Sequence, residues 1–582
     1  MKLNFCIEFY IKNKLEKIQF SKNYSNEIID IEIITQNNSL KINLSAKEEI
    51  ILKSFYGETN HKFNSEDKIF VNGYQSWTDT REYFVSEKMS KLPAFAKLLN
   101  PIFKFKQYGD YNFFTKKLKT GDFYGFATAY IKNGNNFHYF ISENEDFAHT
   151  VFLFSRKSEK IYFIVDCENV VINQKTTILN FIENQGDYQN ITNYFKSISI
   201  NQSLKPKTGW TSWYNYYQNI NQDIILNNLN NFSNYFPAQS IFQIDDGFQT
   251  YVGDWLNIDK VKFPAGLSKI VEQIHKLNYQ AGLWLAPFAA ETKSELVKNH
   301  PDWILKDKNG KKIFGGSNWS KFYALDFYNQ EFRTYLKHVF DTILLNWKFD
   351  IVKLDFLYSV ALIPQHGKSR AKMMSEAMSF LREIVGDKQI LACGVPIAQA
   401  FNKVEYCRIG ADISLDWNGK FYEKLLHRER VSTYNSLKNT IFRHFLDKSV
   451  FLNDPDVFLL RDENIKLTKI QKITVFLINS IFGSLVFTSD DFSKYNLWQR
   501  QLLQNLQFFH SAKVSTIKHD NDLYEYYFQI NDIQYVGFSN LSKKVNKINS
   551  LNYNLLDIFT LKILEDKNKG ILNAYETKIY ER

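Results

Sequence analysis

The chain has 582 residues, of which 44% are hydrophobic and 23% are charged, proportions typical of a folded globular protein rather than a disordered one. A single core rarely holds so many residues, so we expect two or three domains. The formal net charge is +10, but the basic residues are scattered along the chain, which argues against a nucleic-acid partner.

The spacing of the cysteines and the residues at the start of the chain indicate the cellular compartment. The four cysteines, Cys6, Cys167, Cys393 and Cys407, form no CxxC pair, so neither a zinc site nor a disulfide framework is expected. Glu8 lies near the start and no long apolar run follows it, which argues against a signal peptide. No stretch approaches the ~20 apolar residues of a membrane span. We therefore expect a cytoplasmic protein with no membrane partner, and we leave a homo-oligomer open.

Residues 1–200 are predicted to form a β-sandwich, because short alternating runs recur between turn-forming residues. The predicted strands are Lys17–Phe20, Ile29–Ile34, Ser39–Leu44, Lys68–Val71, Tyr124–Ile131, His138–Ile141, Ile161–Val165 and Val170–Ile172. Trp77 follows an Asn-Gly turn at Asn72 and Gly73. It either fills the core of the sandwich or reaches a neighbouring site from its loop.

Residues 205–508 alternate short apolar strands with amphipathic helical runs, the pattern of a (β/α)8 barrel. The predicted strands are Gly209–Tyr214, Ser240–Asp246, Ala281–Pro287, Asp350–Phe356, Gln389–Val395, Tyr406–Ile413, Val450–Asp456 and Leu485–Asp490. The predicted helices are Ile224–Phe236, Leu267–Leu277, Asn329–Trp347, Ala371–Val385, Val431–Leu446 and Leu467–Phe482. Residues 509–582 return to alternating strands and are predicted to form a small C-terminal β-domain. The fold class is thus a central TIM barrel flanked by two β-domains.

Polar and aromatic residues gather at the predicted strand ends, where barrels of this type carry their active sites. These residues are Trp213, Tyr214, Asp245, Asp246, Trp284, Lys353, Asp355, Cys393, Arg408, Asp412, Asp454, Asp456, Asp490 and Asp491. Individual aspartates could cap turns or helices. So many acids at one rim nevertheless predict an acid-lined pocket.

Lys353 and Asp355 are two residues apart on one strand, so both side chains point to the same face. A structural ion pair would explain them alone, but a cation also keeps a carboxylate ionised and suited to nucleophilic attack. Asp412 is the best partner acid. Arg408 lies four residues earlier and would lower the pKa of Asp412, so we expect it to face substrate or another acid instead.

Two chemistries use an acidic barrel mouth: glycoside hydrolysis by paired carboxylates, and metal-dependent hydrolysis. The chain has only 11 histidines, none at a predicted strand end, which argues against a metal. Trp213, Tyr214 and Trp284 favour a sugar instead, since aromatic rings stack on sugar faces. Asp245 and Asp246 could accept hydrogen bonds from neighbouring hydroxyls of one ring. We therefore expect a small oligosaccharide substrate and no cofactor.

Several short runs, in this order and spacing, resemble the retaining α-galactosidases of glycoside hydrolase family 36. The runs are Gly209–Tyr214, Phe242–Phe248, Gly282–Phe288, His300–Trp303, Val352–Asp355, Cys407–Asp412 and Leu452–Asp456. The resemblance implies a nucleophile at Asp355 and an acid/base at Asp412. It further implies that Asp245 and Asp246 hold O4 and O6 of galactose and that Lys353 and Arg408 bind ring hydroxyls. The remaining pocket residues would be Cys393, Trp284, Trp213, Tyr214 and Trp77.

The function that follows is a retaining exo-α-galactosidase that acts by double displacement. A transglycosidase, or an α-glycosidase for another sugar, would use the same residues. A catalytically inactive sugar-binding relative is the alternative from another class. No role is assigned to the loop at residues 366–368.

Overall fold

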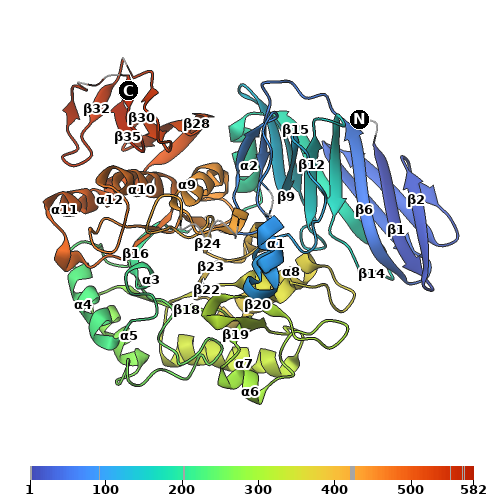
Figure 1. Cartoon of the computed structure of the whole chain (residues 1–582), viewed down its shortest axis with the longest axis horizontal. Helices are drawn as coiled ribbons and strands as arrows, with labels where there is room; N and C mark the ends of the chain where they lie inside the picture. The colour runs from blue at the N-terminus through green and yellow to red at the C-terminus, as the bar shows by residue number, and fades with distance from the viewer. Residues whose placement is uncertain are drawn as a thin grey trace.

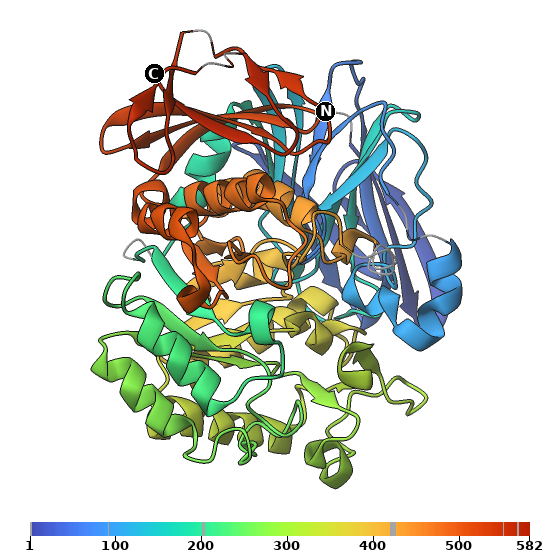
Figure 2. The ribbon, with the colours of Figure 1, turned by 60° about the vertical axis from the view of Figure 1, so that its left-hand side comes forward.

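The computed structural model describes the whole chain except residues 1–2, 91, 93, 201–203, 420–426, 551, 567 and 569. Three parts are visible in Figure 1: an N-terminal β-sandwich, a central barrel surrounded by helices, and a small β-domain at the C-terminus. Figure 2, turned by 60°, shows the C-terminal domain lying across the helices that follow the last barrel strands. The multidomain architecture expected from the sequence is confirmed.

The N-terminal domain consists of two antiparallel sheets packed face to face. One sheet has the order β2-β1-β6-β13-β12-β9, with β14 paired to β6, and the other has the order β3-β4-β5-β15-β11-β10-β7-β8. The first contains β1 Asn4–Ile11, β2 Lys14–Phe20, β6 Ile50–Asn60, β9 Asp122–Phe126, β12 Thr150–Ser155, β13 Lys160–Val165 and β14 Val171–Ile172. The second contains β3 Tyr24–Ser25, β4 Ile29–Gln36, β5 Ser39–Ala46, β7 Lys68–Val71, β8 Arg81–Phe84, β10 Thr128–Asn133, β11 Asn136–Ser142 and β15 Thr176–Gly186.

One predicted strand of this domain, Tyr124–Ile131, is wrong. It is two strands, β9 and β10, which belong to opposite sheets. The chain changes sheet at Ala127, whose φ of 60° breaks the extended conformation. An uninterrupted apolar run does not reveal such a break, because both sheets bury the side chains. The segment that joins β8 to β9 carries α1 Ala94–Phe103 and the 3-10 helix η1 Phe105–Tyr108, and α2 Tyr188–Ser197 leads toward the barrel.

The central domain is a closed barrel of eight parallel strands. These eight strands comprise nine labelled segments, because the seventh is divided into β25 and β26. The segments are β16 Lys207–Thr211, β17 Ile241–Ile244, β18 Gln280–Leu285, β22 Ile351–Leu354, β23 Gln389–Ala392, β24 Tyr406–Arg408, β25 Leu452–Asp454, β26 Val457–Phe458 and β27 Leu485–Thr488. The sheet order runs from β25 through β24, β23, β22, β18, β17, β16 and β27 to β26. Because β25 and β26 are two pieces of one strand, interrupted at Pro455 and Asp456, the two ends of this order meet and the barrel closes.

Helices cover the barrel, as the alternating pattern predicted. They are α4 Gln222–Phe232, α5 Leu267–Lys276, α7 Gln330–Asp341, α8 Arg370–Val385, α9 Thr433–Phe442 and α10 Lys469–Phe482. Asn221, Asn329, Ser369, Ser432 and Thr468 each cap one of these helices with a side-chain oxygen. A short helix, α3 Trp213–Tyr216, follows the first strand. Each predicted helix is present, shifted by a few residues at its ends.

Two further features lie around the barrel mouth. After β18 the chain forms a small sheet of β19 Ala289–Glu291, β20 Phe314–Gly316 and β21 Phe322–Ala324, which the sequence pattern did not predict. The loop at residues 366–368 packs on the N-terminal domain, where the backbone N–H of Val171 donates to the carbonyl of Gly367 at 2.9 Å. These contacts tie the sandwich to the same end of the barrel that holds the acids.

The C-terminal domain follows α11 Leu497–Gln504 and α12 Leu506–His510. Its main sheet contains β28 Lys513–Asp520, β29 Leu523–Ile530, β30 Ile533–Asn540, β35 Thr577–Glu581, β32 Asn554–Leu556 and β33 Ile563–Leu564. The largest hydrophobic cluster of the protein joins barrel residues to Phe70 and Trp77 of the first domain and to Tyr524 and Tyr526 of the last. The barrel core therefore extends into both β-domains, each of which also has a hydrophobic cluster of its own.

Candidate active site

Asp355 stands directly after β22, at the carboxyl end of the barrel, and its carboxylate accepts two hydrogen bonds. The indole Nε1 of Trp284 donates to Oδ2 at 3.1 Å, and the backbone N–H of Phe356 donates to Oδ1 at 2.9 Å. Lys353 Nζ lies 4.0 Å from Oδ2. These groups surround the carboxylate with positive charge and donors, while the residue stays 8% exposed. Two donors and a nearby ammonium therefore hold this carboxylate in a defined orientation.

Lys353 is bonded more closely to Asp245 than to Asp355. Its Nζ lies 3.0 Å from Asp245 Oδ2, which also accepts from Thr211 Oγ1 and Gln243 Nε2. Burial disfavours the charged form of Lys353, but Asp245 and then Asp355 outweigh it and raise the lysine pKa. The ammonium therefore links the ends of β17 and β22, as expected for side chains that share the barrel interior.

Asp246 follows Asp245 and accepts hydrogen bonds from three side chains. Gln218 Nε2 and Trp319 Nε1 donate to Oδ2, each at 2.9 Å, and Gln249 Nε2 donates to Oδ1 at 2.6 Å. Burial raises the pKa of Asp246, and these three bonds oppose the rise. The two acids at this strand end were predicted from the sequence, but the three donors were not, because they come from loops that only the fold brings together.

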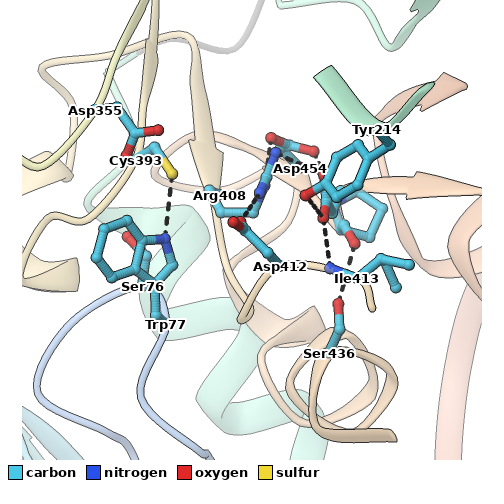
Figure 3. Close-up of polar contacts among 12 residues, drawn as sticks. Ser76, Trp77, Tyr214, Asp355, Cys393, Arg408, Asp412, Ile413, Ser436 and Asp454 are labelled. Carbon is cyan, nitrogen blue, oxygen red and sulfur yellow. Dashed lines mark hydrogen bonds and ion pairs between the residues drawn. The ribbon is translucent and has the colours of Figure 1, made fainter. Parts of the chain in front are cut away.

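Arg408, at the end of β24, binds three carboxylates at once. Its Nη1 lies 2.9 Å from Asp412 Oδ1, its Nε 2.8 Å from Asp454 Oδ2, and its Nη2 2.8 Å from Asp456 Oδ1. Figure 3 shows the guanidinium between Asp412 and Asp454. The expectation that Arg408 would avoid Asp412 is therefore wrong. It does pair with other acids, as expected, but the turn after β24 also brings Asp412 back onto the same guanidinium.

The pKa of Asp412 is raised despite that ion pair. Burial is the largest cause, and the negative charge of Asp355 adds to it, while Arg408 and Lys353 oppose the rise. About a third of the side-chain surface of Asp412, 34%, still reaches solvent. Asp412 therefore combines a raised pKa with an arginine partner, whereas the carboxylate of Asp355 accepts two hydrogen bonds.

A second carboxyl with a raised pKa, Asp456, lies next to Asp412. Burial raises the pKa of Asp456 to about 7, against the opposing charge of Arg408, with Asp412 and Asp454 adding to the rise. Its Oδ2 accepts hydrogen bonds from the hydroxyl of Tyr214 and from the backbone N–H of Ile413. Asp456 thus holds the turn that carries Asp412, and Tyr214 contacts this carboxyl.

The N-terminal domain reaches the site through Trp77. Its Nε1 donates to Cys393 Sγ at 3.3 Å (Figure 3). Its ring packs edge-on against Phe356 and Tyr358. Gly394 makes this approach possible, because a Cβ at its φ of +62° would lie 3.1 Å from both the Trp77 ring and the Phe356 nitrogen. Burial, and then Asp355, raise the pKa of the Cys393 thiol, so it stays protonated.

Three of the predicted strand-end residues contact residues other than the acids described above. Trp213 is half-buried and packs edge-on against Tyr217. Asp490 accepts from Arg461 and Tyr495, and Asp491 caps the 3-10 helix Phe492–Lys494 with its side chain, as a helix N-terminus would. These two acids have structural partners of their own. Trp319 and Phe356 were also not predicted as site residues, and both have left-handed φ angles, 52° and 53°.

Two other structural features are absent from the described residues. No group of three or more His, Cys, Asp or Glu side chains in that part of the chain is arranged to hold a metal ion. Within the same residues, every helix is too short or too polar to cross a membrane.

Comparison with known proteins gives a match to the melibiase family model over residues 199–406. The match begins before β16 and ends at the start of β24, so it includes Asp245, Asp246, Lys353 and Asp355 and stops short of Asp412. AgaA, an α-galactosidase of Geobacillus stearothermophilus, is 28% identical over 141 residues, which are 22% of this chain and 19% of AgaA. An A type blood α-D-galactosamine galactosaminidase of Flavonifractor plautii is 28% identical over 194 residues, 29% of this chain and 16% of that protein. The aligned part thus spans less than a fifth of either relative.

Solved structures extend the likeness over the whole fold. TtGalA, an α-galactosidase from Thermus thermophilus in complex with p-nitrophenyl α-D-galactopyranoside, superposes with a TM-score of 0.69 at 21% identity, over 88% of this chain and 98% of that chain. The glycoside hydrolase family 36 enzyme AgaA superposes with a TM-score of 0.63 at 11% identity, over 95% of this chain and 80% of that chain. At these identities the likeness concerns the fold.

Proposed function

Because this chain is melibiase-like and has the fold of the glycoside hydrolase family 36 α-galactosidases, we propose that it is a retaining exo-α-galactosidase. Its substrates would be oligosaccharides that end in an α-linked galactose. The relatives support the sugar class, since TtGalA was solved with p-nitrophenyl α-D-galactopyranoside and with stachyose.

One observation carries the proposal: a carboxylate that accepts two hydrogen bonds, Asp355, and a carboxyl with a raised pKa, Asp412, stand at the same end of the barrel. Asp355 follows β22 and Asp412 follows β24, and these parallel strands are separated only by β23. The charge of Asp355 contributes to the raised pKa of Asp412, which requires the two groups to lie close together. We expect their carboxyl groups to lie ~5–5.5 Å apart when substrate is bound, the spacing of retaining enzymes.

The reaction would proceed in two displacements. Asp412 gives its proton to the glycosidic oxygen while Asp355 attacks the anomeric carbon, so that the bond to the leaving group breaks and a galactosyl ester forms. Asp412, now ionised, then takes a proton from water, whose oxygen attacks the anomeric carbon and releases Asp355. Two inversions leave galactose in the α configuration and return the proton to Asp412.

Each neighbour of these acids would have a role in binding galactose. Asp245 and Asp246 would face the O4 and O6 side of the ring, and Lys353 joins Asp245 to the nucleophile. Arg408 donates hydrogen bonds to Asp454 and Asp412 and forms an ion pair with Asp456, so its main task would be to hold Asp412, with its other N–H groups available to a ring hydroxyl. Trp284, Cys393 and Trp77 would form the wall beside Asp355.

A related activity has one observation in its favour. The galactosaminidase from Flavonifractor plautii is among the relatives, so an N-acetylated or amino sugar is the second candidate substrate. Transfer to an acceptor other than water would use the same two acids, and product analysis at high acceptor concentration would detect it. A binding protein without turnover would show no activity on any aryl α-galactoside.

The two acids can be assigned by azide rescue, starting from an aryl α-galactoside. Asp355→Gly should turn over only with azide and give β-galactosyl azide, because azide replaces the nucleophile in a single inversion. Asp412→Gly should form the ester with an activated leaving group, and azide should then release α-galactosyl azide. Asp490→Asn, a strand-end acid with structural partners, is the matched control. Rescue products of the reverse configuration would refute the assignment, and an inactive wild type would refute the function.

A further inference from the structure

The segment 317–321, between β20 and β21, has an unusual backbone. Three consecutive residues other than glycine have left-handed φ angles: Trp319 at 52°, Ser320 at 61° and Lys321 at 96°. Residues with a Cβ rarely adopt this region, and never by preference in a row. Such backbone persists only where surrounding contacts impose it, and it concentrates at functional sites.

The contacts that impose this backbone come from the N-terminal domain. The hydroxyl of Tyr108 accepts from the backbone N–H of Ser317 at 2.7 Å and donates to Asn318 Oδ1 at 2.5 Å. The backbone N–H of Lys321 closes the turn onto the carbonyl of Asn318 at 2.8 Å. Tyr108 itself is buried, at 6% exposure, so the turn is held by a fixed side chain rather than by solvent.

The turn points the indole of Trp319 at the candidate active site. Nε1 donates to Asp246 Oδ2 at 2.9 Å. The ring packs against Trp284, with centroids 5.9 Å apart, and against Phe356, at 4.9 Å. Trp284 and Phe356 are the two residues that donate hydrogen bonds to the carboxylate of Asp355. One side chain therefore contacts both Asp246 and the residues around the nucleophile.

The two neighbouring acids differ in the partners of their Oδ2 oxygens, and each accepts a single bond on Oδ1. Asp245 accepts four bonds: one on Oδ1 from the backbone N–H of Asp246, and three on Oδ2 from Thr211, Gln243 and Lys353. Asp246 accepts three from described residues, and a carboxylate offers about four acceptor positions. Asp246 thus has one position left, on Oδ1, which is enough for a single hydroxyl.

We propose that Trp319 is a positioning residue that sets the sugar specificity of this site. By occupying one acceptor position of Asp246 and packing beside it, Trp319 leaves Asp246 able to bind one hydroxyl of galactose in one orientation. This inference rests on the proposed function, and it assigns that hydroxyl to the 4- or the 6-position of the ring. Loss of the indole N–H would free Oδ2 and let the carboxylate turn, so recognition of that hydroxyl would weaken.

The test compares three substrates: p-nitrophenyl α-D-galactopyranoside and its 4-deoxy and 6-deoxy analogues. In Trp319→Phe, which keeps a ring but lacks the N–H, kcat/KM for the galactoside should fall about 10- to 100-fold, the effect of one hydrogen bond to a charged group. For the analogue that lacks the recognised hydroxyl, kcat/KM should stay near the wild-type value. The ratio of kcat/KM between the galactoside and the analogue that lacks the recognised hydroxyl would therefore fall. The ratio for the other deoxy analogue would remain at the wild-type value.

A second variant and a control keep the result interpretable. Tyr108→Phe removes the hydroxyl that holds the turn, and it should reduce the same selectivity. Trp498→Phe, the same substitution on α11 away from the site, should leave all three substrates unchanged. If all three substrates lose activity equally in Trp319→Phe, or none does, the proposal is overturned. An inactive wild type would instead overturn the proposed function before any variant is compared.

Discussion

Arg408 and Asp412 form a 2.9 Å ion pair, although the proposed role of Asp412 requires a proton that a neighbouring arginine opposes. Arg408 opposes the proton less strongly because its positive charge is shared among several carboxylates. The same guanidinium binds Asp454 and Asp456, so its charge is spread over three carboxylates, and burial together with Asp355 raises the Asp412 pKa. Arg408 can therefore hold the acid in place without keeping it ionised.

Replacement of Arg408 should destabilise the protein strongly. Arg408→Met leaves buried carboxylates without their cation, which should cost about 3–5 kcal/mol of unfolding free energy. Arg408→Lys keeps the charge but cannot bridge three acids, so it should fold and lose turnover. Urea unfolding measures the first effect and steady-state kinetics the second. Arg500→Met, at an exposed arginine, should change stability by less than ~0.5 kcal/mol, and an equal loss there would contradict the explanation.

The pH dependence of activity should report the proton on Asp412. Because its pKa is raised, kcat/KM should stay high above the ordinary aspartate range and fall as pH rises through that pKa, when the acid loses its proton. In Asp412→Ala, tested with a leaving group that needs no protonation, this alkaline limb should disappear. Activity on an oligosaccharide, whose leaving group needs a proton, should drop about 10²–10⁴-fold. An unchanged limb in Asp412→Ala would exclude this residue as the acid.

Stability should depend on pH through Glu429, which joins the loop after Asp412 to the N-terminal domain. Its carboxyl accepts from Thr78 at 2.8 Å and from Tyr111 at 2.6 Å. Burial raises its pKa to about 7, opposed by Arg428 and assisted by Asp110. Because the folded state holds this proton above the ordinary glutamate pKa, the stabilisation is full below about pH 4.5 and is lost as pH rises toward 7.

The corresponding variant is Glu429→Gln, which cannot ionise. Relative to wild type, it should gain on the order of 3 kcal/mol in unfolding free energy between pH 5 and 8. Urea unfolding at several pH values measures this gain. Glu66→Gln, at an exposed glutamate, should follow wild type throughout. If the unfolding free energies of Glu429→Gln and wild type change in parallel with pH, Glu429 does not govern the pH dependence of stability.

The approach of Trp77 to the barrel should depend on Gly394. Gly394→Ala places a methyl group 3.1 Å from the Trp77 ring and the Phe356 nitrogen, so it should lower both stability, by about 1–3 kcal/mol, and activity. Gly134→Ala is the matched control, because its φ of +58° carries the same backbone strain but nothing lies within 4 Å of the added Cβ. Equal losses in both variants would assign the effect to backbone strain rather than to Trp77.

Much of the fold could be predicted from the sequence, because hydrophobic period and turn residues act locally. The eight barrel strands and the main helices follow directly from apolar runs and capping residues. The exceptions arise where the chain departs from the regular pattern. Ala127 divides one apolar run between two sheets, and the small sheet β19–β21 has strands too short to produce a periodic signal.

For the candidate site, the sequence by itself determined which acids stand at the strand ends, since parallel strands place their carboxyl ends at one rim. The tertiary structure alone decided what surrounds them. Asp355 is held by Trp284 of the neighbouring strand β18, and Asp246 by Trp319 of the segment between β20 and β21. Asp412 is held by Arg408 of the preceding strand, because the turn after β24 folds back onto the guanidinium. Hydrogen bonds and burial depend on distances in space, which residue spacing along the chain does not contain. The chemical types of the site were therefore readable from the sequence, whereas the protonation and orientation of each group were set by the fold.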